Sequence, residues 1–140
     1  MKNILIILSF LLLATAMQAS GQSFKVIVNN DNSVASISKS DLSAIFLKTN
    51  TRWADGSTIE PVDQSARSAV REVFSQEVHG RNVGAIRSHW QQAAFSGAGT
   101  APLERGSDAD VVQFVQSNPG AIGYVSADAN VSGVKTISVQ

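Results

Sequence analysis

The residues whose types and spacing could do chemistry are concentrated at positions 57–74, which read STIEPVDQSARSAVREVF. β-Branched residues around Pro61 predict a strand, because proline pushes the residue before it out of the helical region. Residues 63–65 are then predicted to form a polar turn. Ser65 is a natural N-cap for the amphipathic helix that follows, since its hydroxyl can accept a hydrogen bond from the first helical turn. This junction would direct backbone N–H groups at an anion.

Arg67 and Arg71 are four residues apart on the predicted helix, on a different stripe from the apolar residues that would face a core. Like charges at this spacing destabilise an exposed helix by roughly 0.2–0.5 kcal/mol, so we expect them to have a partner. Asp63 is one candidate. A bound oxyanion is another, because the helix dipole, free N–H groups and guanidinium groups all favour it.

The alternative is that both arginines are solvated and that Ser65 only caps the helix. If the junction binds a small oxyanion, the candidate residues are Asp63, Gln64, Ser65, Ala66, Arg67, Ser68 and Arg71.

The sequence offers little for catalysis or metal binding. His79 and His89 are ten residues apart and match no zinc motif. Ser65 lacks the G-x-S-x-G context of a nucleophile elbow, and no phosphate-binding loop of the P-loop type is present. We therefore expect a protein that is not an enzyme and that uses no metal and no cofactor.

Residues 1–21 have the three parts of a secretory signal peptide: Lys2, an apolar run at positions 4–13, and small residues up to Ala19. The apolar run is shorter than the about 20 residues that span a membrane. Cleavage after Ala19 and cleavage after Gly21 both fit, and an uncleaved anchor is the alternative. With no cysteine for lipid attachment, we expect export to the periplasm, or secretion, without membrane insertion after cleavage.

Residues 22–140 are predicted to form a single domain, because about 120 residues suffice to bury one core. The whole chain has 11 basic and 11 acidic side chains, and removing Lys2 with the leader leaves a formal charge of −1. A nucleic-acid-binding domain would usually show a basic excess. Nucleic acid is therefore not an expected partner.

Strands are predicted at positions 24–28, 121–125 and 134–139, in addition to the strand around Pro61.

Capping boxes that begin at Ser38 and at Ser107 predict two helices, and apolar residues three or four apart at positions 83–94 predict a third. With the helix after Ser65, these elements predict an α/β fold in which about four helices flank a small mixed sheet, in two or three layers.

The order of the sequence blocks resembles the PstS-like phosphate ABC transporter substrate-binding family, whose members have the type II periplasmic binding protein fold. The blocks are IFLKTNTRWADGSTIEPVDQ at positions 45–64, VREVF at 70–74, the pair Trp90 and Phe95, and PGAIGYV at 119–125. The resemblance implies a single lobe of that fold, phosphate as the small oxyanion, and a bacterial envelope setting.

The chain departs from the family pattern at two points. Full-length members have two lobes, and this chain resembles the second lobe. The family's anion site resembles R-S-D-G-S-G-T, and the matching stretch here is PVDQSAR at positions 61–67. Ser65 is kept, Pro61 takes the position of the arginine, and Arg67 or Arg71 is the candidate to replace that guanidinium group.

Two functions are consistent with these observations. The first is an exported solute-binding-like protein that recognises phosphate or a similar oxyanion at the helix start, with an envelope protein or a transporter component as a further partner. The second is an envelope interaction module, without a transport role, that has kept the fold but not the ligand. The retained Ser65 favours the first function, and Pro61 favours the second.

Overall fold

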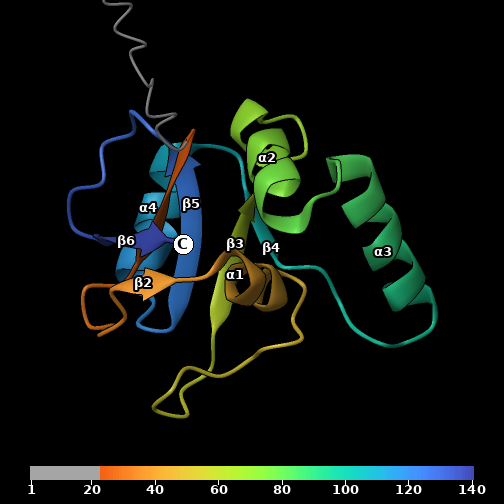
Figure 1. Cartoon of the computed structure of the whole chain (residues 1–140), viewed down its shortest axis with the longest axis horizontal. Coiled ribbons are helices and arrows are strands. Elements are labelled where there is room, and N and C mark those ends of the chain that lie inside the picture. Colours follow the sequence, from red (N-terminus) through yellow and green to blue (C-terminus); the bar gives the residue numbers. More distant parts are fainter. Residues whose placement is uncertain (1–22) are drawn as a thin grey trace, which may run out of the picture.

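The computed structural model describes residues 23–140 as a three-layer α/β sandwich (Figure 1). The leader predicted for residues 1–21 lies outside the described residues. In chain order the elements are β1 (Phe24–Val28), β2 (Ser36–Ile37), α1 (Lys39–Phe46), β3 (Glu60–Gln64), α2 (Ala69–Phe74), the π-helix η1 (Ser75–His79), α3 (Val83–Phe95), β4 (Leu103–Arg105), α4 (Asp108–Ser117), β5 (Ala121–Ser126) and β6 (Lys135–Val139). Within the described part of the chain, no helix has both the length and the apolar character needed to cross a bilayer.

The central sheet has six strands in the order β2-β6-β1-β5-β3-β4. β3 runs parallel to both β4 and β5, whereas β1 is antiparallel to β5 and to β6. The predicted mixed sheet flanked by four helices is therefore confirmed. The short strands β2 and β4 at its two edges were not predicted, because two or three residues carry no alternating pattern of their own.

Apolar side chains are buried on both faces of the sheet. On β1, Val26 and Val28 contribute to a core beneath α1, α2 and η1, while Ile27 belongs to a second core beneath α4. Four aromatic rings fill the first core, where Phe74 stacks on Tyr124 with ring centroids 3.8 Å apart. Helix α3 lies at one side of the molecule, beyond α2 and η1 (Figure 1).

The two predicted capping boxes are confirmed as N-caps. Ser38 Oγ accepts a hydrogen bond from the Asp41 N–H at 3.0 Å, and Ser107 Oγ accepts one from the Asp110 N–H at 3.2 Å. Local sequence thus sets the start of α1 and of α4.

Gly123 allows α4 to approach the sheet closely. It pairs with Ile27 on one side and Val62 on the other, and a Cβ placed there would lie 2.7 Å from Val111 Cγ1 and 2.8 Å from Val62 Cγ1.

We expect Gly123→Ala to lower the free energy of unfolding by about 1–3 kcal/mol through overpacking, measured by urea denaturation. At Gly106 an added Cβ meets nothing within 4 Å. Equal losses for Gly106→Ala and Gly123→Ala would contradict this account.

His79 at the end of η1 is half-buried, and its Nδ1 lies 2.7 Å from Ser43 Oγ. Burial lowers the pKa of His79 to about 4 from its ordinary 6.5. The unfolded chain therefore binds a proton more readily between these values, so stability present above pH 6.5 is lost as the pH falls towards 4.

We expect this loss to be about 1–2 kcal/mol after allowing for screening by solvent. Unfolding curves measured at pH 7 and pH 4 should show it in the wild type and in His89→Gln but not in His79→Gln. A loss of the same size in His79→Gln would refute the assignment.

Candidate functional site

The candidate site lies at the carboxyl ends of the parallel strands β3, β4 and β5, which meet at one edge of the sheet. Ligands of open α/β sheets bind outside the carboxyl ends of the strands. β3 ends at Gln64 and is followed by residues 65–68, here called the β3–α2 loop, before α2 starts at Ala69. All seven predicted site residues belong to β3, this loop or α2.

Two local predictions about this segment were wrong. Asp63 and Gln64 continue β3 and do not form a turn, and the helix starts at Ala69 with Ser68 at the N-cap position, so Ser65 is not the N-cap. The cause is strand pairing. Gln64 is in register with Arg105 of β4, and the Ser65 N–H donates to Arg105 O at 3.0 Å, which keeps the chain extended past the predicted turn.

Arg71 points into the protein and is only 4% exposed. Its Nε lies 3.2 Å from Asp63 Oδ1, and its Nη1 donates to Glu104 Oε1 at 2.8 Å and to Gln64 O at 2.6 Å. The predicted arginine stripe on an exposed helix face is therefore wrong, and Asp63 is the partner of Arg71. Asp63 and Glu104 face each other across β3 and β4, so Arg71 also neutralises two like charges.

Tyr124 completes the buried network from β5. Its hydroxyl donates to Asp63 Oδ1, and the Gln64 N–H donates to the same carboxylate oxygen at 3.1 Å. Burial raises the pKa of Asp63, and Arg71 acts against that shift. Burial, with the neighbouring carboxylate, raises the pKa of Tyr124, which keeps its hydroxyl protonated as a donor.

Gln64 connects the loop to the rest of the sheet. Its Nε2 donates to Asp108 Oδ1 at 2.7 Å and to Tyr124 O at 3.1 Å, and its Oε1 accepts from Ser68 Oγ at 3.1 Å. Asp108 also accepts from the Ser126 N–H at 3.1 Å. Sequence reasoning missed the role of Tyr124, Glu104 and Asp108 here, because they lie 36 or more residues beyond the loop.

The remaining candidates are accessible. Ser65, Ala66 and Ser68 are half-buried, and Arg67 is exposed and forms no ion pair with any residue between positions 23 and 140. The Arg67 N–H donates to Ser65 Oγ at 3.4 Å, and no side chain accepts from the first turn of α2 at Ser68. The Ser68 N–H donates to Ser65 O at 2.9 Å and the Arg71 N–H donates to Ser68 O at 3.1 Å. The N–H groups of Ala69 and Val70 remain available, since the first N–H groups of a helix have no acceptor within it.

The chain matches, over residues 20–138, the model of a family described as a PBP superfamily domain. The chain belongs to this superfamily. The resemblance and the fold class predicted from the sequence are thereby confirmed. A comparison with curated proteins gave no significant match.

Solved structures with the same fold include three phosphate-related proteins. An ABC-type phosphate transport receptor from Vibrio cholerae is 21% identical with a TM-score of 0.67, and the match covers 84% of this chain and 46% of that one. A protein from Clostridium perfringens, described as a phosphate ABC transporter substrate-binding protein with bound phosphate, is 20% identical with a TM-score of 0.67, over 84% and 44%. PstS from Borrelia burgdorferi is 13% identical with a TM-score of 0.59, over 84% and 47%.

At these identities the likeness establishes the fold, and this PBP superfamily domain spans less than half of each of the three proteins. The fold supports a solute-binding role. The described residues contain no group of three or more side chains placed to hold a metal ion.

The Asp63–Arg71 pair generates a prediction about stability. Arg71→Met leaves a buried carboxylate without its cation, so we expect the free energy of unfolding to fall by about 3–5 kcal/mol in urea denaturation. Arg67→Met removes an exposed arginine from the adjoining loop and should change it by less than about 0.5 kcal/mol. Similar effects for the two variants would be inconsistent with the buried network.

Proposed function

We propose that this domain is an exported solute-binding protein that recognises a small oxyanion, with phosphate as the first candidate, at the β3–α2 loop. The observation that carries the proposal is the set of donors left at this loop: the N–H groups of Ala69 and Val70 at the start of α2, the hydroxyl of Ser65, and the guanidinium of Arg67, which forms no ion pair with a described residue. Oxyanions favour such donors at the start of a helix. The phosphate named for the solved structures of this fold supports the choice of probe.

The predicted site residues then have two roles. Ser65, Ala66, Arg67 and Ser68 contact the oxyanion. Asp63, Gln64 and Arg71 are positioning residues, since Arg71 holds Gln64 O and the side chain of Gln64 holds Ser68 Oγ. Because Arg71 already has two carboxylate partners, it adds little net positive charge for a ligand.

The proposed affinity is low for this domain by itself. The loop is only half-buried, and exposed charge contacts are worth no more than about 1 kcal/mol each. A few such contacts give a Kd in the range of about 1 mM. Enclosure by a second surface would strengthen them, because water would be excluded from the oxyanion. A transporter component or another envelope protein is the proposed source of that surface.

A phosphate titration followed by amide NMR tests this proposal. We expect saturable shifts at residues 65–70 that sulfate reproduces weakly and that chloride at equal ionic strength does not. Arg67→Gln should weaken binding about fivefold, which corresponds to about 1 kcal/mol.

The matched control is Arg87→Gln, which removes an exposed arginine from α3 and should leave the titration unchanged. Shifts that follow ionic strength alone, or that survive Arg67→Gln, would refute the oxyanion site. They would favour the second function, an envelope interaction module.

A further inference from the structure

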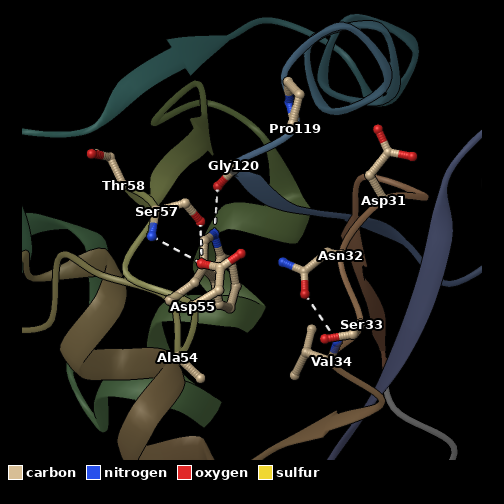
Figure 2. A pocket seen from close by; sticks show the side chains of 11 residues that line it. Asp31, Asn32, Ser33, Val34, Ala54, Asp55, Ser57, Thr58, Pro119 and Gly120 are labelled. Carbon is tan, nitrogen blue, oxygen red and sulfur yellow. Dashed lines mark hydrogen bonds between the residues drawn. The ribbon is translucent and has the colours of Figure 1, made fainter.

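A cavity of about 440 Å³ lies at the end of β3 and β5 opposite to the β3–α2 loop (Figure 2). Three segments surround it: the turn after β1, the loop that leads into β3, and the residues just before β5. The lining residues are Asp31, Asn32, Ser33, Val34, Trp53, Ala54, Asp55, Ser57, Thr58, Pro119 and Gly120. The amino ends of two parallel strands thus adjoin this cavity, so it is separate from the proposed oxyanion site.

Backbone hydrogen bonds hold the aromatic wall of this cavity in place. The Trp53 N–H donates to Ser57 O, and the Gly56 N–H donates back to Trp53 O, each at 2.9 Å. Trp53 Nε1 donates to Gly120 O at 3.0 Å, which fixes the indole ring against the start of β5. A Cβ at Gly120 would lie 2.3 Å from Thr58 O, so the close approach of the two segments requires glycine there.

The polar groups of the cavity include two carboxylates without a cation. Asp55 Oδ1 accepts from the Ser57 N–H at 2.9 Å and from Ser57 Oγ at 2.6 Å, and the carboxylate forms no ion pair within residues 23–140. These hydrogen bonds lower the pKa of Asp55 and keep it ionised. Asp31 lies on the other side of the cavity from Asp55 (Figure 2) and forms no ion pair with a described residue.

Two cations contact residues that line the cavity. Arg52 Nη1 donates to Gly56 O at 3.2 Å and to Thr58 Oγ1 at 3.5 Å, and Lys135 Nζ donates to Asn32 O at 2.9 Å. Neither side chain lines the cavity, whose charged lining residues are the two aspartates alone. The cavity therefore combines an aromatic ring and short apolar side chains with two carboxylates that form no ion pair within residues 23–140.

We propose that this cavity binds a small organic cation, an ammonium group attached to a short carbon chain. The ammonium group contacts Asp55 Oδ2 within the field of Asp31, where opposite charge lowers its energy. The carbon chain lies against Val34, Pro119 and Trp53, and the indole ring adds a cation–π attraction. A pocket of apolar walls with a few convergent polar groups is typical of small-molecule sites.

Titration of the full-length protein with butylammonium chloride, followed by amide NMR, tests this inference. We expect saturable shifts at residues 31–34, 53–58 and 120, with no change at residues 65–70. Sodium chloride at the same ionic strength, 1-butanol and glucose should not reproduce them, because none of these presents an ammonium group.

Asp55→Asn keeps the shape of the side chain and should weaken binding about fivefold, since Asp55 is exposed. Trp53→Phe should weaken it by a smaller factor, since phenylalanine is a poorer cation–π partner. Asp128→Asn, at an exposed aspartate outside the cavity, is the control and should bind as the wild type does. Absence of saturable shifts, equal shifts with butanol or glucose, or unchanged binding by Asp55→Asn would each overturn the proposal, whatever the result of the phosphate titration.

Discussion

The buried ion pair between Asp63 and Arg71 is the interaction on which the geometry of the candidate site depends. It joins the last part of β3 to the first turn of α2, and Glu104 and Tyr124 extend it to β4 and β5. The charges of Asp63 and Arg71 can be buried because each is paired with the other and hydrogen-bonded, whereas Glu104 is exposed. The β3–α2 loop follows this network directly, so its shape is set by contacts made beneath it.

The two arginines of this segment differ in burial and in partners. Arg71 is buried and contacts two carboxylates and a carbonyl oxygen. Arg67, four residues earlier, is exposed and has no ion-pair partner in the described residues. The proposed oxyanion site and the proposed cation site then lie at opposite ends of β3. The opposite charge preferences follow from the charges left without a partner in the described residues. These are Arg67 at one end of β3, and Asp31 and Asp55 at the other.

Much of the fold could be predicted because its signals are local. The capping serines Ser38 and Ser107 precede their helices by one residue, and the strands β1 and β5 are mostly apolar. The family resemblance placed these elements in one architecture. The candidate site was predicted only as a segment of chain. Residues 63–71 contain the loop and the Asp63–Arg71 pair, but the structure gives several of them other roles than the predicted ones.

The sequence by itself determined the α/β class, the family and the polar segment after β3, because helix caps, apolar periodicity and sequence blocks act over a few residues. Only the tertiary structure decided that Ser68, and not Ser65, occupies the N-cap position before α2, and that Arg71 is buried. The register between β3 and β4 extends the strand past the predicted turn, and it brings Glu104 opposite Asp63. Such pairing joins residues about 40 positions apart, and its energy exceeds the local preference of a serine for an N-cap.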